Sequence, residues 1–173
     1  ADGKGQFVDG TATYNGFDEL PGSDAGANVV IIRPEGGVQA QVPIPPAAEN
    51  STLEEVSLEF LGNGKLKLSV TLTARGDRAS YLRAIYLQSG TRATQLENQW
   101  ARHKPGAKVT KVEANDLANI DLPPSIKYEV ELPDAYTTDA NGNIELAVAL
   151  NPLLFGRGLG AAATRRTDIA PGA

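Results

Sequence analysis

The chain has 173 residues, which suits one ordinary domain and is long enough to bury a core without covalent cross-links. It contains no cysteine, which excludes disulfides, thiolate metal ligands and thiol catalysis within this chain. The 16 Lys and Arg residues are scattered and are outnumbered by 21 Asp and Glu residues, giving a net charge of −5. Because nucleic-acid binding needs a basic face, we expect no nucleic-acid partner.

No apolar run approaches the length of about 18 residues that a membrane span needs. The polar start at residues 1–5 is not a signal peptide, and the chain does not begin with methionine. Together these features lead us to expect a fragment excised from a longer protein.

The first elements are short. Residues 6–13 form a weak extended segment, and turns follow at Asn15-Gly16 and Pro21-Gly22. Residues 28–33 form an apolar run that predicts a strand buried on both faces. A tight turn at residues 35–37 then leads into a return strand.

The prolines of residues 43–46 cannot donate ladder hydrogen bonds, so we place a boundary near residues 43–50. Beyond it, apolar residues alternate on both sides of Asn63-Gly64, the pattern of a β-hairpin with a type I′ turn. A second Asn-Gly, within residues 139–142, predicts a hairpin that joins strand 126–132 to strand 144–150.

Between these hairpins the apolar spacing changes to that of helices. Asp77 is the expected cap of a helix over residues 77–88, whose apolar face holds Tyr81, Leu82, Ile85 and Tyr86. Thr91 is the expected cap of a second helix, which ends near residue 104 because Pro105 disfavours helix before it. A strand over residues 107–112 follows.

The predicted fold class is α+β, mainly antiparallel β, as a sheet or sandwich of hairpins with a two-helix insertion. We divide the chain into residues 1–46, a β-rich domain over residues 47–151 with helices near 77–88 and 91–104, and a Gly/Ala-rich terminal arm over residues 152–173.

Four other groups of residues raise alternatives, and we favour the structural interpretation of each. Residues 139–145 carry oxygen ligands at alternate positions, as calcium loops do, but the glycine is misplaced and a hairpin turn explains the composition. Residues 156–161 resemble a dinucleotide glycine loop without the surrounding βαβ unit. Aromatic residues for a carbohydrate platform are more often core residues; they are Trp100, Tyr81, Tyr86 and Tyr128. His103 lies at a helix end without a nucleophile nearby in the sequence. No metal or cofactor is expected.

Residues 7–12 read Phe-Val-Asp-Gly-Thr-Ala, followed by Glu-Leu-Pro at 19–21 and the run at 24–32. This stretch resembles the part of a transglutaminase-like Cys-His-Asp thiol enzyme that carries the triad aspartate, which is Asp9 here. In that family the cysteine and histidine precede the aspartate. The resemblance therefore implies that Asp9 is the triad acid of a parent protein and is not competent in this chain. The alternative for Asp9 is an Asx-type turn with Gly10 and Thr11.

The rest of the chain resembles the uncharacterised β-rich domain that follows the catalytic core in many bacterial transglutaminase-like proteins. The short matching words are Pro45-Pro46, Glu49-Asn50, the hairpin at Gly64, residues 75–79 with Leu82-Arg83, residues 105–107, and Arg165-Arg166. The resemblance implies that residues 1–46 are the end of the catalytic core and that the chain is an accessory or scaffold fragment, not an enzyme. It also implies an extracytoplasmic location and the missing N-terminal core as the partner.

If the core is missing, the strand over residues 28–33 should either present an exposed apolar patch or associate with another copy through it. A different class of function stays open. The chain could be an independent extracytoplasmic β module that binds a glycan or a protein partner.

Overall fold

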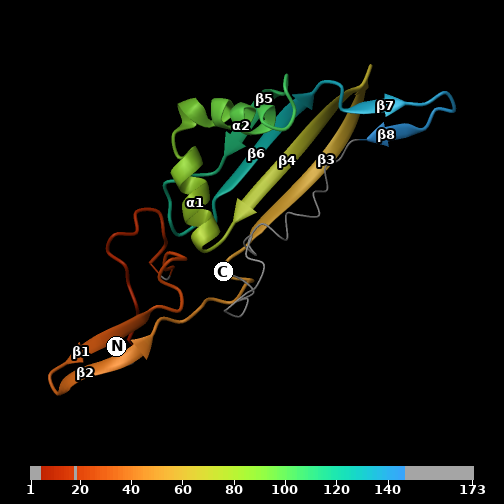
Figure 1. The fold of residues 1–173 in the computed structure, drawn as a ribbon. Coiled ribbons are helices and arrows are strands. Elements are labelled where there is room, and N and C mark those ends of the chain that lie inside the picture. The colour runs from red at the N-terminus through yellow and green to blue at the C-terminus, as the bar shows by residue number, and fades with distance from the viewer. Residues whose placement is uncertain (1–4, 18, 147–173) are drawn as a thin grey trace.

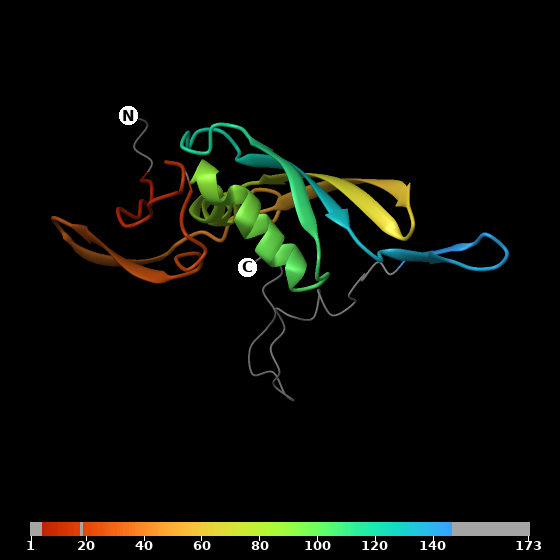
Figure 2. The same cartoon turned by 90° about the horizontal axis from the view of Figure 1, so that it is seen from above.

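The structure, a computed structural model, describes residues 5–17 and 19–146 (Figure 1). Its main body is a four-stranded antiparallel sheet with the strand order β3-β4-β6-β5, and two helices cover one face of it (Figure 2). A two-stranded hairpin projects from each end of this body (Figure 1). In chain order the elements are β1 (Asn28–Arg33), β2 (Gly36–Gln41), β3 (Thr52–Gly62), β4 (Lys65–Ala74), α1 (Asp77–Tyr86), the 3-10 turn η1 (Ser89–Thr91), α2 (Arg92–Ala101), β5 (Lys108–Ala114), β6 (Ser125–Leu132), β7 (Tyr136–Thr138) and β8 (Ile144–Leu146). The predicted α+β class, mainly antiparallel with a two-helix insertion, is confirmed.

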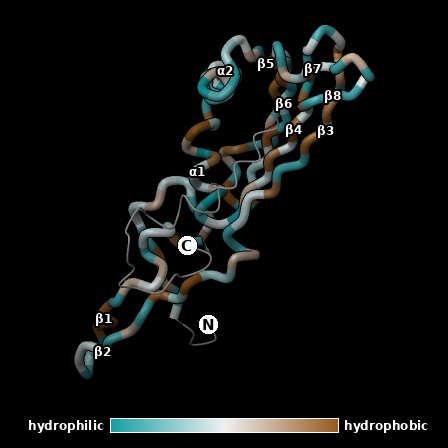
Figure 3. The backbone as a smooth tube through the Cα atoms, turned by 45° about the vertical axis from the view of Figure 1, so that its right-hand side comes forward, coloured by the Kyte–Doolittle hydropathy of each residue, from teal (hydrophilic) through white to brown (hydrophobic). Residues whose placement is uncertain are grey.

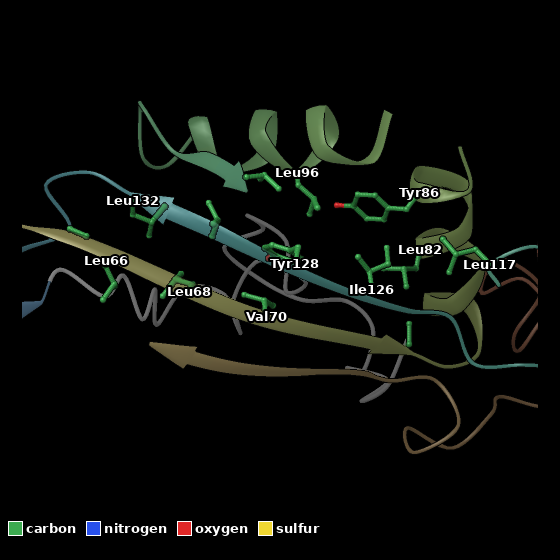
Figure 4. Close-up of a cluster of buried hydrophobic side chains, with 14 of the residues drawn as sticks. Leu66, Leu68, Val70, Leu82, Tyr86, Leu96, Leu117, Ile126, Tyr128 and Leu132 are labelled. Carbon is green, nitrogen blue, oxygen red and sulfur yellow. The ribbon is translucent and has the colours of Figure 1, made fainter. Parts of the chain in front are cut away.

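The core lies between the helices and the sheet (Figure 4). Every second residue of β4 and β6 points into it, because successive side chains of a strand alternate between the two faces. The helices contribute Leu82 and Tyr86 from α1 and Leu96 from α2. Both helices have 10 residues and are too short to cross a bilayer, and no other helix in residues 5–17 and 19–146 could do so.

The β3–β4 hairpin turns at Asn63-Gly64 as predicted. Asn63 has φ 50° and Gly64 has φ 75°, both in the left-handed region that a type I′ turn requires. The turn at residues 139–142 exists, but the prediction that it joins strand 126–132 to strand 144–150 is wrong. That turn joins β8 to the short strand β7, whereas β6 pairs with β4 and β5 inside the main sheet. Strand 144–150 can be checked only to Leu146, since residues beyond it lie outside the described part.

Three expectations about the N-terminal region were wrong. Residues 6–13 form no strand and contain a turn around Asp9. The β1–β2 turn lies at Pro34-Glu35, because Gly36 already pairs with Arg33. The strand over residues 28–33 exists as β1 but is not buried on both faces. It pairs with β2 alone, and Ile32 is 89% exposed.

The helices start and end close to the predicted positions, but their caps differ. Gly76, not Asp77, is the N-cap of α1, and α2 ends at Ala101, not near residue 104. Thr91 is the N-cap of α2, yet its hydroxyl bonds the carbonyl of Gln88 and makes no capping bond. The buried face of α1 includes Arg83 and excludes Tyr81, which is exposed.

Arg83 is a charged side chain inside the core region, with 1% exposure. Its guanidinium donates to the carbonyl oxygens of Tyr14 at 3.0 Å, Ile120 at 3.2 Å and Leu122 at 2.7 Å. No ion pair to Arg83 is present in the described part of the chain. Three backbone carbonyls from two distant segments therefore take the place of a carboxylate.

We predict that Arg83→Leu destabilises the protein by about 3 kcal/mol or more, because three carbonyls lose hydrogen bonds to a charged donor that are worth about 1.5–3 kcal/mol each. Urea unfolding followed by circular dichroism measures the loss. The control is Arg102→Leu, at an exposed arginine, which should change stability by no more than about 0.5 kcal/mol. Equal effects of the two substitutions would contradict the role assigned to Arg83.

Candidate functional site

Asp9 lies in the turn that follows residues 5–8, and its carboxylate closes a local Asx turn. Asp9 Oδ1 accepts hydrogen bonds from the amide and the hydroxyl of Thr11, both at 2.8 Å, and Oδ2 accepts from the same hydroxyl at 2.9 Å. The backbone turn is closed by a bond from the amide of Ala12 to the carbonyl of Asp9. This is the alternative that the sequence left open for Asp9.

The hydrogen bonds of the turn also act on the ionisation of Asp9. The Thr11 amide, and then the Thr11 hydroxyl, lower the pKa of Asp9 below its usual value because both donate to the ionised form. A carboxylate has about four lone-pair sites, so the turn leaves room for a further donor such as an imidazole N–H. The geometry is compatible with a triad acid but requires no such role.

His103, the one histidine of the chain, lies far from Asp9 in the sequence and in a different environment. It follows α2 and lines a cavity of about 300 Å³ together with Gln99, Trp100, Arg102 and Tyr128. None of residues 5–12 lines this cavity. The structure therefore does not bring the histidine and the candidate acid into one site.

We call this smaller cavity the aromatic pocket. Its lining shows whether the aromatic residues considered for a carbohydrate platform lie together. Trp100 and Tyr128 do meet there, but Tyr128 and Tyr86 are buried, and Tyr81 lies apart on the exposed side of α1. Burial raises the pKa of Tyr128 to about 12, and a hydrogen bond with Trp100 opposes that rise. The Tyr86 hydroxyl donates to Gln99 Oε1 at 2.8 Å. Two of the three tyrosines are thus core residues whose hydroxyls are occupied, and Trp100 is the one partly open ring at the pocket.

The larger cavity, about 690 Å³, lies where the N-terminal region meets the main body. We call it the junction cavity. Its lining comes from residues 5–7, 19–25, 43–50 and 76–78, and includes four prolines, Phe7, Leu20 and Ile44 alongside Glu19, Glu49, Asp77 and Arg78. Its volume falls in the range of small-molecule sites, and its mixed lining suits an apolar ligand or a peptide segment.

Two contacts join the N-terminal region and the connector to the start of α1 at the junction cavity. The Asp77 carboxylate, the predicted helix cap, accepts from the amide of Gly22 at 3.0 Å and so ties the start of α1 to the N-terminal region. Gly76 has φ 62°, and a Cβ there would come within 2.5 Å of the carbonyl oxygen of Glu49. Only glycine allows this approach of the connector to the helix.

The Asp139 carboxylate holds its own hairpin turn, as expected if residues 139–145 are a turn and not a calcium loop. It accepts from the amides of Asn141 and Asn143 and from the Asn143 side chain, each at 2.8 Å. These bonds lower the pKa of Asp139. Within residues 5–17 and 19–146, no cluster of three or more histidines and carboxylates could hold a metal ion. The glycine-rich residues 156–161, and the arm that contains them, lie outside the described residues.

Several contacts of the junction were not found by sequence reasoning. The segments Arg75–Ala79 and Leu82-Arg83 contain the close approach at Gly76, the Gly22–Asp77 bond and the buried guanidinium. The sequence indicated only that Asp77 is a helix cap and that Leu82 lies on an apolar helix face. Buried Arg83 carries no local sequence signal because its three partners are 37 to 69 residues away.

Comparison with protein-family models, with curated proteins and with solved structures finds no match to this chain. Function must therefore be argued from the geometry and from the sequence resemblance.

We predict that Thr11→Val raises the pKa of Asp9 toward 3.8, since one of the two donors to its ionised carboxylate is lost while the amide remains. Carboxyl carbon NMR across the acid range measures the change. In the wild type the lowered pKa adds stability that is lost as the pH falls through the pKa of folded Asp9, and the variant should lose part of it. Asp139 is the internal control because its own turn is intact. An unchanged pKa of Asp9 would contradict the hydrogen bond from the Thr11 hydroxyl.

Proposed function

We propose that this chain is a non-catalytic accessory or scaffold portion of a transglutaminase-like protein, which completes or flanks the catalytic core through the β1–β2 hairpin. The observation that carries the proposal is the exposure of this hairpin. Val30 is 61% exposed and Ile32 is 89% exposed, although they belong to an uninterrupted apolar run (Figure 3).

The pairing register explains why this hairpin needs a covering partner. Val30 and Ile32 lie on one face, opposite Gln39 and Gly37, while Val29 and Ile31 lie on the other face, opposite Ala40 and Val38. Both faces of β1 are therefore apolar, which is typical of a strand inside a larger, covered sheet. A lone two-stranded hairpin is marginally stable in water, so covering both faces would stabilise it.

The exposed aliphatic side chains of the hairpin indicate how much free energy docking could gain. Each large aliphatic side chain gains roughly 1.5–3 kcal/mol when it is fully buried. Covering the exposed parts of Val30 and Ile32, together with Val38 on the other face, would therefore contribute several kcal/mol to docking before association costs are subtracted. This contribution favours docking of the hairpin against a covering surface.

The resemblance supplies the identity of the partner. In a parent protein, the cysteine and the histidine would come from the catalytic core, and Asp9 would orient the histidine through the acceptor capacity that its turn leaves free. The chain by itself has no thiol to attack an acyl group. Its part in the reaction would be to position one carboxylate and to stabilise the core.

We predict that the wild-type chain self-associates through β1 as its concentration rises, and that Val30→Ser with Ile32→Ser abolishes this, because the exposed apolar surface is lost. Sedimentation velocity over a concentration series measures the association. The matched control is Tyr81→Ser, which removes a solitary exposed aromatic from α1 and should leave association unchanged. The unfolding midpoint of the main body should be the same in all three proteins.

The same variants test the family assignment. A core that carries a cysteine and a histidine, translated from the coding sequence upstream of Ala1 and expressed separately, should bind the wild-type chain and fail to bind the Val30→Ser/Ile32→Ser variant. A strictly monomeric wild type, or an upstream sequence without those two residues, would contradict the proposal.

The alternative, an independent extracytoplasmic β module that binds a glycan or a protein, is favoured by one observation. Trp100, partly open, lines the aromatic pocket beside the polar side chains of Gln99, Arg102 and His103. Aromatic faces next to hydrogen-bonding groups are suited to sugar rings.

Trp100 is the one tryptophan of the chain, so its fluorescence reports this pocket directly. Under the accessory function, we predict no shift of the emission maximum when a panel of oligosaccharides is added to millimolar concentration. A saturable shift that Gln99→Ala weakens at least about tenfold, equivalent to 1.4 kcal/mol, would favour the glycan-binding alternative.

A further inference from the structure

The second apolar surface of the molecule lies on β3, at the edge of the main sheet. Val56, Leu58 and Phe60 are 45%, 50% and 47% exposed. Their partners on β4 are Val70, Leu68 and Leu66, all buried. Residues directly opposite in an antiparallel pair point to the same face, so these three side chains continue the core layer. We call them the β3 apolar face.

The helices leave this face uncovered because they lie toward the other edge of the sheet. The labelled core side chains gather between the helices and strands β4 and β6, away from β3 (Figure 4). The opposite face of β3 carries Glu55, Ser57 and Glu59, with Glu59 paired to Lys67 across the strands, and has Leu53 near the start of the strand. Within the described residues, β3 pairs with β4 along one edge and has no strand on the other. Val56, Leu58 and Phe60 therefore form one open apolar surface on the helix side.

The described chain ends beside this face. Tyr136 of β7 contacts Phe60 in an edge-to-face ring pair with centroids 5.0 Å apart, and Tyr136 is paired with Leu146 of β8. Neighbouring strands are separated by about 4.8 Å, so Leu146 lies next to the Phe60 end of the β3 apolar face. Leu146 also packs against the core. The next residues start where the uncovered surface starts.

The sequence after Leu146 has the chemistry that this surface requires. Residues 147–155 are apolar except for Asn151 and Pro152, and none of them is charged. If extended, this segment could reach about 30 Å, which exceeds the length of β3 from Phe60 to Val56. The residues that follow include Arg157, Arg165 and Arg166, and Glu54 of β3 lies on the same face as Val56, Leu58 and Phe60.

We propose that residues 147–155 pack across the β3 apolar face of the same molecule and complete its core. Connection through Leu146 places this segment beside the face at an effective concentration in the millimolar range. A second copy of the chain would compete at its solution concentration, typically far lower. The tethered segment is therefore the favoured occupant, and it is independent of the proposed docking of β1–β2.

Disulfide trapping in the full chain tests the proposal. Because the chain has no native cysteines, only the introduced pair can form a disulfide. Leu58→Cys combined with Leu150→Cys should form an intramolecular disulfide under mild oxidation, detected as a monomer of altered mobility on a non-reducing gel. The matched control is Ser57→Cys with Leu150→Cys, because residue 57 points to the opposite face of the same strand. We expect the Leu58 pair to cross-link at least about tenfold more than the control.

The other outcomes overturn the proposal. A disulfide-linked dimer in place of the monomer would assign the β3 apolar face to a second copy. Equal cross-linking of the two pairs, or none in either, would mean that residues 147–155 do not occupy this face. Thermal unfolding of the reduced variants checks that both are folded, and since Leu58 and Ser57 are exposed, we expect both to fold.

Discussion

The arrangement of the molecule depends on the buried guanidinium of Arg83. A charged group removed from water is costly unless its hydrogen-bonding capacity is used, and here three carbonyls provide that compensation. Tyr14 belongs to the N-terminal region, while Ile120 and Leu122 belong to the loop between β5 and β6. The Arg83 side chain therefore holds the segment around Tyr14 and the β5–β6 loop against α1, although neither segment has regular secondary structure at these residues. Its Nε atom has no hydrogen-bond partner among the described residues, so the compensation is incomplete.

The opposite, N-terminal end of α1 fixes the position from which the β1–β2 hairpin projects. The Gly22–Asp77 bond and the close approach of Gly76 to Glu49 hold both strands of the connection against the start of the helix. The pairing between Gly26 and Val42 then extends the ladder of the hairpin toward its base. An apolar hairpin without a partner would be a liability, and here its base is secured to the main body while its tip is free (Figure 1). Such an arrangement presents the hairpin to another surface.

The parts of the fold that depend on local signals could be predicted, and the parts that depend on distant contacts could not. Asn63-Gly64 between alternating runs determined the β3–β4 hairpin, since the turn chemistry and the side-chain period agree. The sequence predicted that the Asp139 turn follows β6 directly. The strand that does precede the turn, β7, has only three residues, too few to show apolar alternation. Burial of β1 was inferred from its composition, yet burial needs a second layer that residues 5–17 and 19–146 do not supply. Of the candidate site, the position of Asp9 and its alternative as an Asx turn were visible in the sequence, whereas the junction cavity was not.

The two exposed apolar surfaces make different demands on a partner. The β3 apolar face is one-sided and flanked by a formed core, so a single layer of chain is enough to cover it. The β1 strand is apolar on both faces and requires enclosure, as in the interior of a larger sheet. The hairpins β1–β2 and β7–β8 lie at opposite ends of the body (Figures 1 and 2), so the segment that starts at Leu146 begins far from β1. If residues 147–155 cover β3, as proposed, they are not available to β1. Covering β1 on both faces would then require a surface from another folded unit, as the proposed docking to a catalytic core would provide.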